Sequence, residues 1–384
     1  MSEAPRLRIA VLNRHFGYRF GGAERYAAAI AEQLSQRHEV HVFSQDIEHA
    51  HPGITYHRIS RPLAKPRWIN QLWFALQTWL QTRRGFDVVH SHENTWHGHL
   101  QTVHVRPFRI GLFHGKSTGQ RWLRALSLIT SPRLLAYWCL EAARFSPRQD
   151  RWVVATSDAV MRETVTGYPH TAPVTVVIAP GVNLPGTAIT PEEARQQLSL
   201  PLDVPLALFV GNDFDKKGLP TLLEALVTVP SVHLAVVGQG RRLTHYRQQI
   251  EALGLKDRVH LLGSLADVSP AYAAADGLVH PTTEDTYAMV VLEAMAHGLP
   301  VLVSSAHYCG IAAELTHGSD ALILDHPQDS KELARHLNTL LTNSDLRTSL
   351  KEAGLHFARE RSWTHAAQRH ETLMEQVRSQ HRNL

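Results

Sequence analysis

Short apolar runs alternate with helix-length segments along the whole chain, and this alternation restricts the fold more than any other feature. In the first half, the runs expected as strands are 8–12, 39–44, 87–92, 100–105, 151–155 and 174–178. In the second half, they are 206–210, 233–237, 259–262, 277–280 and 300–304. Strands that alternate with helices in sequence form parallel sheets wound with crossover helices. The sequence therefore predicts an α/β fold with doubly wound, Rossmann-like parallel sheets.

The chain of 384 residues is longer than a single hydrophobic core usually becomes, so we expect two domains. Turn-forming residues without periodicity fill 179–186, and a hinge is expected there. The N-terminal domain is then 1–182 and the C-terminal domain 187–362, with a last helix predicted over 363–383. In doubly wound domains, ligand sites lie at the carboxyl ends of the strands.

Composition argues against several classes of protein. Apolar residues make up 43% of the chain and charged residues 19%, as in folded soluble proteins and unlike disordered ones. The two cysteines, Cys139 and Cys309, are far apart, which argues against a disulfide framework or a structural zinc site and indicates a reducing compartment. No apolar stretch reaches the roughly 18 residues of a membrane span, and the N-terminus lacks a signal-peptide pattern. We expect a protein of the cytosol or of a membrane face.

Basic residues are concentrated in one part of the chain. Residues 58–151 contain 15 Lys and Arg against four Asp and Glu, a net charge of +11, whereas the whole chain carries +4. A basic region of this size indicates an anionic partner, which could be nucleic acid, phospholipid or a phosphorylated acceptor. A nucleic-acid-binding protein is the weaker alternative, because no motif with stacking aromatic residues accompanies the charge.

One predicted helix, 69–81, has a face of large apolar side chains: Ile69, Leu72, Trp73, Leu76, Trp79 and Leu80. Basic residues stand at both of its ends. The favoured interpretation is a helix that turns this face toward the core or that acts as a lid. The alternative is a basic, aromatic helix that contacts a membrane.

The first of three motifs that can carry chemistry is the pair Gly21-Gly22, between the first predicted strand and the first helix. Glycines let a backbone approach a ligand closely, and the helix N-terminus behind them offers unpaired amides to phosphate. A plain tight turn explains the pair equally well, and the spacing lacks the third glycine of the dinucleotide fingerprint.

The second motif, 209–218, follows the first strand of the second domain and contains the adjacent Lys216 and Lys217. Two ammonium groups in a strand-to-helix loop can neutralise a diphosphate leaving group, whereas the alternative is a solvated lysine pair. Asp213 and Asp215 form an Asp-x-Asp pair of the kind that can hold a divalent cation. We expect no metal there, because the two lysines directly beside the pair would compete with the ion.

The third motif, 285–293, is the most specific, because it sets Asp285 and Glu293 eight residues apart. One acid in a loop before a helix and another on that helix can reach a single ligand from two sides, for instance two sets of sugar hydroxyls. The backbone amides of Ala288 and Met289 would then face a phosphate. Incidental surface acids are the alternative.

Five histidines lie close together in the first half: His90, His92, His97, His99 and His104. A metal centre is the weaker interpretation, because residues that alternate along strands do not supply a third ligand by their spacing. An ordinary core or surface histidine is the favoured interpretation for His92 and the alternative for His104.

Together, these three motifs resemble glycosyltransferase family 4, whose members have the GT-B fold of two Rossmann-like domains facing a central cleft. Residues 213–218 are especially similar to the lipopolysaccharide-core glucosyltransferases, and 135–145 resembles a segment that those enzymes carry ahead of the strand at 153–157. The similarity spans essentially the whole chain and is strongest over 210–302. It also implies that the last helix, 363–384, completes the first domain.

The resemblance gives roles to the acids and lysines of the second domain. Glu293 would bind the ribose hydroxyls and Asp285 those of the donor sugar, while Lys216 and Lys217 would hold the diphosphate together with the amides of the third motif. Two departures from the family pattern bear on this. Asp285 stands where the pattern usually has Glu, and Asn212 stands where many relatives have a phosphate-binding Arg.

In the first domain, the resemblance places Gly21 and Gly22 over the same diphosphate. His104 falls where family members have the catalytic His or Asp near the reacting centre. We therefore expect His104, Asp285 and Lys217 to carry the reaction, and Asp213 to belong to the donor site with the residues named above.

The resemblance implies a retaining glycosyltransferase that moves a hexose, such as glucose, from a nucleotide-sugar, such as a UDP-sugar. The acceptor would be a lipopolysaccharide-core or other envelope glycan or glycolipid, met at the inner face of the cytoplasmic membrane, with the basic first domain touching the anionic lipid. Neither a cofactor nor a metal is expected, because lysines and helix-end amides stabilise the leaving diphosphate. The alternatives are a GT-B sugar-nucleotide epimerase, which would leave the basic region unexplained, an inactive sugar-nucleotide sensor and, less favoured, a nucleic-acid-binding protein.

Overall fold

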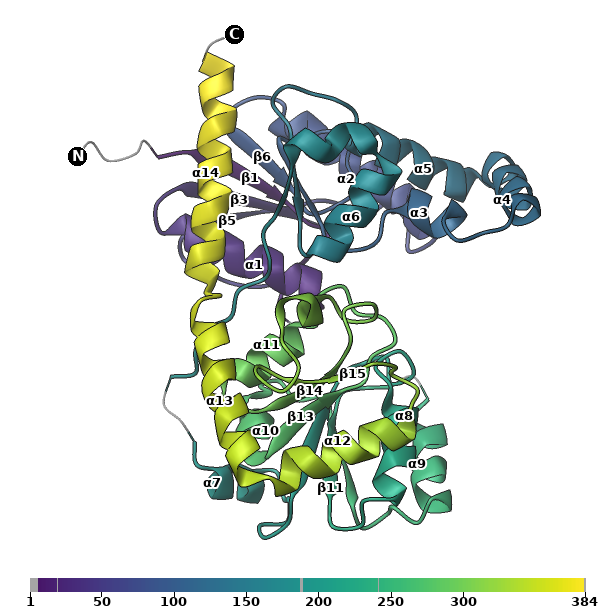
Figure 1. The fold of residues 1–384 in the computed structure, drawn as a ribbon. Helices are drawn as coiled ribbons and strands as arrows, with labels where there is room; N and C mark the ends of the chain where they lie inside the picture. Colours follow the sequence, from purple (N-terminus) through teal and green to yellow (C-terminus); the bar gives the residue numbers. More distant parts are fainter. Residues whose placement is uncertain (1–5, 19, 187–188, 241, 383–384) are drawn as a thin grey trace. The chain divides into compact units, whose positions relative to one another are not determined.

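The computed structural model describes residues 6–18, 20–186, 189–240 and 242–382. The chain divides into two compact units (Figure 1). Unit 1 comprises Met1–Gly181 together with Trp363–Leu384, and unit 2 comprises Val182–Ser362. The domain boundary expected at residue 187 lies outside the described residues.

Unit 1 is built on a seven-stranded parallel sheet with the strand order β5-β3-β1-β6-β7-β8-β9. Its strands are β1 (Arg8–Leu12), β3 (Glu39–Ser44), β5 (Ile54–Arg58), β6 (Val88–Ser91), β7 (Leu100–Val103), β8 (Trp152–Ala155) and β9 (Thr175–Val177). A small second sheet pairs β2 (His15–Gly17) with β4 (Asp46–Glu48). The helices of unit 1 are α1 (Gly22–Ser35), α2 (Arg67–Thr82), α3 (Phe108–Phe113), α4 (Thr118–Thr130), α5 (Pro132–Arg144), α6 (Asp158–Gly167) and α14 (Trp363–Arg382).

Unit 2 has a six-stranded parallel sheet with the order β12-β11-β10-β13-β14-β15. Its strands are β10 (Leu206–Val210), β11 (His233–Val237), β12 (Val259–Gly263), β13 (Gly277–His280), β14 (Val301–Ser304) and β15 (Leu322–Leu324). The helices are α7 (Pro191–Gln197), α8 (Leu219–Val227), α9 (Leu243–Ala252), α10 (Ser269–Ala274), α11 (Met289–Ala296), α12 (Ser330–Thr342) and α13 (Ser344–Arg359). The hydrophobic core of this unit joins the buried sides of these strands to α8, α9 and α12.

The predicted α/β fold with two parallel sheets is confirmed. Strands β1, β3, β10, β11 and β13 have the predicted bounds, because each contains a short apolar stretch that is buried in its sheet. The prediction missed the edge strands β5 and β15. β5 contains exposed and half-buried polar residues, and β15 has only three residues, so neither carries the signal of a buried strand.

The C-terminal helix α14 packs along α1 and belongs to unit 1 (Figure 1). Trp363 meets the ring of Tyr26 edge-on, with 5.5 Å between the ring centroids. Further along α14, Glu371 accepts a hydrogen bond from His38 at 2.8 Å. Helix α14 therefore helps to build the core that begins with β1.

Three buried histidines, the half-buried His104 and a tyrosine form a cluster between the sheet and α14. The rings of His90 and His92 lie 4.3 Å apart, and His370 of α14 lies 5.1 Å from His90. Tyr26 contacts His104 edge-on at 5.1 Å. Burial keeps the pKa of each imidazole below its ordinary value, to about 3 for His104 and about 4 for His370. All four rings are therefore neutral at pH 7.

The prediction that the apolar face of α2 turns toward the core is wrong. Leu76, Trp79 and Leu80 are 38%, 37% and 42% exposed. The helix instead buries a mixed polar and small face: Asn70, Gln71, Phe74, Ala75, Thr78 and Thr82.

This face can be buried because its polar groups have partners. Gln71 donates to the Asn94 carbonyl at 3.0 Å, and Asn70 donates to the Leu63 carbonyl. Thr78 and Thr82 donate to carbonyls one turn earlier in the helix. Buried polar side chains cost little free energy when they are hydrogen-bonded, so hydrophobic periodicity alone assigned the wrong face.

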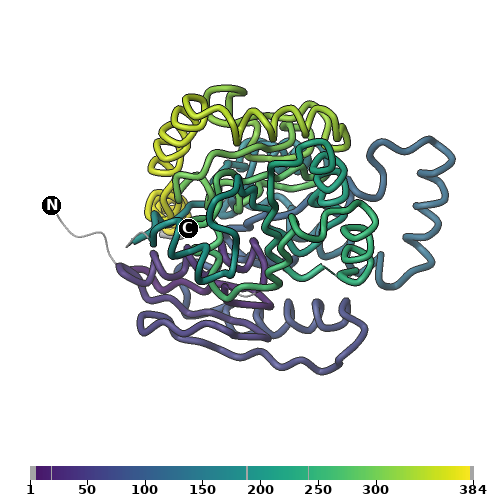
Figure 2. Tube along the Cα trace, turned by 90° about the horizontal axis from the view of Figure 1, so that it is seen from below, coloured from purple at the N-terminus to yellow at the C-terminus, as the bar shows by residue number. Residues whose placement is uncertain are grey.

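Helix α4 has no buried residue. Four large apolar side chains on it are exposed: Trp122 at 74%, Leu123 at 67%, Leu126 at 60% and Ile129 at 75%. The segment α3–α5 extends outward from the sheet of unit 1, with α4 at its far end (Figure 1), and the same segment projects in the second view (Figure 2). The described residues therefore leave the apolar face of α4 uncovered.

We predict that the histidine cluster makes unit 1 sensitive to acid. The folded state holds these imidazoles neutral, whereas the unfolded chain takes up a proton at each below about pH 6.5. Each fully buried histidine therefore lowers the free energy of unfolding by up to about 1.4 kcal/mol for every pH unit below that point. Urea unfolding of the whole chain at pH 7.5, 6.5 and 5.5 should show this loss.

Replacing His370 with Gln removes one of these groups, so the pH dependence should become shallower. His356 is exposed and lies 3.8 Å from Glu360, so His356→Gln serves as the matched control and should leave the slope unchanged. If the free energy of unfolding of His370→Gln falls with pH as steeply as that of the parent protein, His370 is not held neutral in the folded state.

Candidate functional site

The strand order of unit 2 reverses direction between β10 and β13. From β10 the chain proceeds to β11 and β12 on one side, and it then returns to β13, β14 and β15 on the other. In open parallel sheets, ligands bind at the carboxyl ends of the strands beside such a switch point. The second motif follows β10 and the third follows β13, so both motifs lie at this point.

Backbone contacts join the two loops. The Lys216 carbonyl accepts from the amide of Thr283 at 2.8 Å and from the hydroxyl of Thr282 at 3.0 Å. Gly218 has φ +82°, and a Cβ there would lie 1.9 Å from the carbonyl oxygen of Pro281. Glycine is therefore required where the first loop passes the second.

The side chains of Lys217 and Asp285 meet across these loops. Lys217 Nζ lies 2.5 Å from Asp285 Oδ2, and both side chains are mostly buried. His280, the last residue of β13, lies 3.2 Å from the same oxygen and is fully buried. The structure thus brings together one predicted cation and one predicted acid, with a histidine that sequence reasoning did not single out.

Protonation in this group follows from its contacts. Burial alone would raise the pKa of Asp285, but the hydrogen bond from His280 and the charge of Lys217 hold that pKa well below its ordinary value. Burial lowers the pKa of His280, and Asp285 only partly offsets the shift. His280 is therefore neutral and donates its Nε2 proton, because an ionised carboxylate can only accept.

Helix α11 begins beside this group. Ala288, its N-cap, has the left-handed angles φ 69° and ψ 66°, which are uncommon for a residue other than glycine. The Ala288 amide donates to Asp285 Oδ1 at 2.9 Å, so it is occupied, contrary to the expectation that it faces a phosphate. The amides of Met289 and Val290 have no hydrogen-bond partner within the described ranges. These two amides are the donors that an anion can reach at this helix end.

Glu293 lies one turn into α11 and is half-buried. Its Oε2 accepts from the Tyr272 hydroxyl at 2.8 Å. The ring of Tyr272 lies 4.9 Å from that of His297, which bonds back to the Glu293 carbonyl at 2.8 Å. Tyr272 is a second residue that sequence reasoning missed, because it comes from α10, far from the motif in sequence.

The two aspartates of the Asp-x-Asp pair, Asp213 and Asp215, make separate sets of hydrogen bonds. Asp213 accepts from the amide of Lys216 at 3.3 Å, within its own loop. Asp215 pairs with Arg242 and accepts from the Tyr246 hydroxyl at 2.8 Å. Lys216 is exposed and lies 3.0 Å from Glu284. The two aspartates therefore bind different partners.

In unit 1, the glycine pair stands at the start of α1. Gly21 is the N-cap, in extended conformation, and Gly22 is the first helical residue. A Cβ on Gly21 would come within 2.9 Å of the Glu24 carboxylate. The pair follows β1, beside the point between β1 and β6 where the strand order of this sheet reverses.

His104 follows β7 and contacts a second histidine. Its Nε2 lies 2.9 Å from Nδ1 of His92, whose Nε2 is buried without a partner in the part of the chain that the structure describes. An orphaned N–H is rarer than an orphaned acceptor, so the bridging proton belongs to His92 Nδ1. His104 Nε2 then accepts, and its own proton sits on Nδ1. His104 is half-buried, and its pKa of about 3 keeps the imidazole neutral at pH 7.

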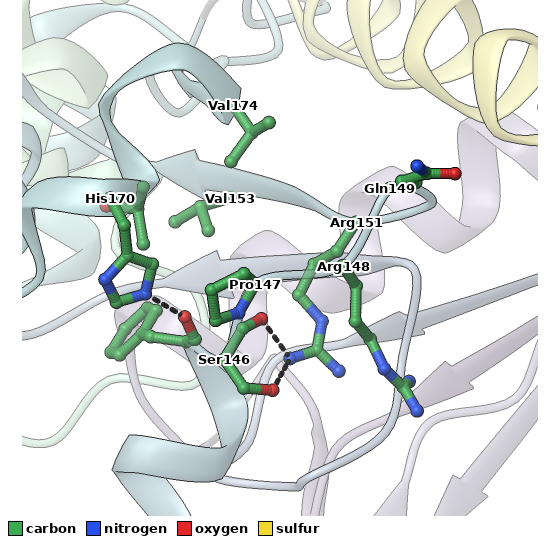
Figure 3. A pocket seen from close by; sticks show the side chains of 10 residues that line it. Ser146, Pro147, Arg148, Gln149, Arg151, Val153, His170 and Val174 are labelled. Atoms are coloured by element: carbon green, nitrogen blue, oxygen red, sulfur yellow. Dashed lines mark hydrogen bonds between the residues drawn. The ribbon is translucent and has the colours of Figure 1, made fainter.

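A pocket of about 350 Å³ lies elsewhere in unit 1 (Figure 3). It is lined by Phe145, residues 146–149, Arg151, Val153, His170, Thr171 and Val174. These residues stand at the amino ends of β8 and β9, the edge of the sheet opposite His104. The Arg151 guanidinium donates hydrogen bonds to backbone carbonyls and to the Ser146 hydroxyl, so it is not available to a ligand. The pocket therefore does not belong to the predicted site.

Two family models match consecutive parts of the chain. Residues 20–184 match the model described as Glycosyltransferase Family 4, and residues 191–357 match the one described as Glycosyl transferases group 1. The first half of the chain is thus similar to glycosyltransferase family 4 and the second half to the group 1 glycosyltransferases. The resemblance inferred from the three motifs is thereby confirmed.

Two curated relatives are lipopolysaccharide enzymes. The chain is 34% identical over 169 residues to lipopolysaccharide glucosyltransferase WaaG of Escherichia coli K12, over 43% of this chain and 44% of that protein. It is 30% identical over 172 residues to the lipopolysaccharide core biosynthesis glycosyltransferase LpsE of Rhizobium meliloti, over 45% and 50%. The chain thus spans about half the length of these curated relatives.

Two solved structures share the fold. The crystal structure of WaaG superposes with a TM-score of 0.80 and 22% identity, covering 95% of this chain and 99% of that one. Anabaena HepE in complex with UDP and glucose gives 0.70 and 21%, covering 99% and 100%. The predicted GT-B architecture of two Rossmann-like domains is confirmed by this likeness.

We predict that Gly218→Ala destabilises unit 2 far more than its backbone angle alone requires. Gly254 has φ +69° with open space around its Cβ position, so Gly254→Ala isolates the left-handed strain, about 1–2 kcal/mol. Gly218→Ala adds the clash with the Pro281 carbonyl and should cost several kcal/mol in the free energy of unfolding. Equal losses in the two variants, measured by urea unfolding, would contradict the close approach of the loops.

Proposed function

We propose that this chain is a glycosyltransferase that transfers a hexose from a nucleotide-sugar to an envelope glycan with retention of configuration. One observation carries the proposal. At the switch point of unit 2, Asp285 links the Lys217 ammonium to the start of α11, where the amides of Met289 and Val290 have no partner among the described residues. A cation and a helix N-terminus at the carboxyl end of a parallel sheet form a site for phosphate.

The chemistry assigned to this site is electrostatic. When the bond between the anomeric carbon and the diphosphate breaks, negative charge grows on the leaving phosphate. Lys217 and the α11 amides stabilise that charge, and Lys216 adds a second, exposed cation. No metal is needed in this scheme. The protein supplies no nucleophile; the acceptor hydroxyl attacks from the face that the diphosphate leaves, and its proton passes to an oxygen of the leaving diphosphate.

Unit 2 is the donor domain in this proposal and unit 1 the acceptor domain. Glu293, oriented by the Tyr272 hydroxyl, is the carboxylate proposed for the ribose hydroxyls. Gly21 and Gly22, at the start of α1, are proposed to approach the diphosphate from unit 1. His104 is proposed to donate its Nδ1 proton to the donor sugar or to the acceptor, and its low pKa argues against a general base.

The proposed donor is UDP-glucose, in which glucose is the transferred sugar and uridine diphosphate the leaving group. The matched relatives include a lipopolysaccharide glucosyltransferase and a lipopolysaccharide core glycosyltransferase. HepE, which shares the fold, has been solved with UDP and glucose. The similarity to these proteins supports UDP-glucose as the donor and a lipopolysaccharide-core or related glycan as the acceptor.

A membrane surface is the proposed setting. Within the described ranges, no helix has both the length and the apolar character needed to cross a bilayer. The exposed face of α4 carries Trp122, Leu126 and Ile129 at helical spacing, with the exposed Arg121 and Arg124 beside them. An apolar face with adjacent basic residues suits the interface of an anionic bilayer. We place the protein at the inner face of the cytoplasmic membrane, bound through the basic unit 1.

We predict that Lys217→Ala lowers turnover of UDP-glucose by about 10²–10³-fold, because one stabiliser of the leaving group is lost. The assay measures UDP release with an envelope glycan acceptor in the presence of EDTA. Lys216→Ala is the neighbouring control; because Lys216 is exposed, its loss should cost less than about tenfold.

Three results would contradict the proposal. Near-normal turnover in Lys217→Ala would remove the phosphate role of this lysine. Activity lost in EDTA and restored by Mn²⁺ would show that a metal is required. Conversion of the UDP-sugar to its epimer without any acceptor would favour the epimerase alternative.

We predict that the double change Trp122→Ser and Leu126→Ser releases the protein from anionic vesicles. Each large apolar side chain contributes about 1.5–3 kcal/mol when fully buried, so the partition coefficient should fall by at least about tenfold. Cosedimentation with phosphatidylglycerol-containing vesicles measures this fall. Leu202 of unit 2 is similarly apolar and 46% exposed, so Leu202→Ser is the control and should bind like the parent protein. Undiminished binding of the double variant would contradict a role for α4.

A further inference from the structure

The carboxylate of Asp285 has protein donors on both of its oxygens. Oδ2 accepts from Lys217 Nζ at 2.5 Å and from His280 Nε2 at 3.2 Å. Oδ1 accepts from the backbone amides of Ala288 at 2.9 Å and of Tyr287 at 3.3 Å. An ionised carboxylate offers about four acceptor positions, so these four donors use its capacity.

The backbone of Asp285 is fixed as well. Its amide donates to the Tyr308 carbonyl at 2.8 Å, and its carbonyl accepts from the Gly310 amide at 3.0 Å. A Cβ on Gly310 would lie 1.9 Å from the Thr286 carbonyl oxygen, so the backbone segments around residues 286 and 310 are in direct contact. The carboxylate therefore cannot move outward with its backbone without breaking these contacts.

The length of the aspartate side chain matters for this arrangement. A carboxylate that accepts from amides two and three residues further on makes the turn typical of Asp and Asn. The longer Glu side chain does not form it in the same way. Here the turn holds Ala288 in its left-handed conformation, from which α11 starts. The choice of Asp at position 285 is thus coupled to the geometry of the helix end.

We propose that Asp285 is a positioning residue, which holds the Lys217 ammonium beside the first turn of α11 and does not itself bind the donor sugar. The inference rests on the proposed function, because it assumes that a nucleoside diphosphate binds at this turn. An ammonium has three donors, and Asp285 uses one of them. Lys217 can therefore hold a diphosphate while it stays paired with Asp285.

This role differs measurably from that of a sugar ligand. A residue that binds only the sugar changes the affinity for UDP-glucose and leaves the affinity for UDP alone. A residue that holds Lys217 and the α11 turn changes both affinities by the same factor. The ratio of the two dissociation constants is therefore the deciding quantity.

The experiment uses Asp285→Asn and Asp285→Glu in the full chain, titrated calorimetrically with UDP and with UDP-glucose. Asn keeps the oxygen that accepts from the Ala288 amide but removes the charge that neutralises Lys217. Both ligands should then bind more tightly by about fivefold, the equivalent of one partly buried ion pair. Glu keeps the charge but loses the turn, so both ligands should bind more weakly by a common factor. In each variant, the ratio should stay within about twofold of the parent value.

Turnover provides the second readout. Without its partner, the Lys217 ammonium is no longer held in place, so the kcat of Asp285→Asn should fall at least about tenfold while its KM falls as well. The matched control is Asp329→Asn. Asp329 accepts from the amides of Lys331 and Glu332 at 3.0 Å, a similar turn at the start of α12. Asp329→Asn should leave both dissociation constants and kcat unchanged.

Two outcomes would overturn the inference while leaving the proposed function standing. A loss of UDP-glucose affinity of about tenfold or more in Asp285→Asn, with UDP unchanged, would make Asp285 a sugar ligand. Parent-like binding and turnover in both variants would show that it positions nothing. If the parent protein itself binds neither UDP nor UDP-glucose, nor GDP, ADP and their sugars, the proposed function fails first and this inference fails with it.

Discussion

The pairing of Lys217 with Asp285 ties together the two loops on which the candidate site depends. One loop follows β10 and the other follows β13, neighbouring strands at which the winding of the unit 2 sheet reverses. Ion pairs between mostly buried groups stabilise a structure only when further hydrogen bonds satisfy both partners. Here the neutral His280 and two backbone amides complete the shell of Asp285. The same carboxylate accepts from the amide of Ala288, which is in a left-handed conformation, and so links the cation to the start of α11.

In unit 1, several neutral imidazoles lie in contact near the carboxyl ends of the strands. His90, His92, His104 and His370 lie in contact, and burial holds each in the uncharged form. His370 comes from α14, so the final helix contributes to the surroundings of His104. A histidine in such a place works as a fixed hydrogen-bond donor. Acid and base catalysis near neutral pH would require a pKa closer to 7.

Sequence patterns predicted the parts of the site that consist of contiguous residues. The lysines of 209–218 and the acids of 285–293 were recognisable because each motif joins a buried strand to a helix. His280 and Tyr272 were missed, since the first looks like the end of an apolar strand and the second lies on another helix. The hydrogen bond from the Ala288 amide to Asp285 could not be predicted either. It depends on where a neighbouring carboxylate points, which no spacing rule specifies. The burial of α2 shows the same limit, because polar residues that find partners, such as Asn70 and Gln71, can face the core.

The sequence by itself determined the fold class, most strand positions and the location of both unit 2 motifs. Period and residue type are local properties, and strands such as 206–210 and 233–237 carry them without help from the rest of the chain. Only the tertiary structure decided which groups meet. Lys217 and Asp285 are 68 residues apart, and their contact exists because parallel winding brings the ends of β10 and β13 to one edge of the sheet. Strand order arises from long-range packing and is not encoded in any single segment, so the partners of a side chain follow from the fold alone.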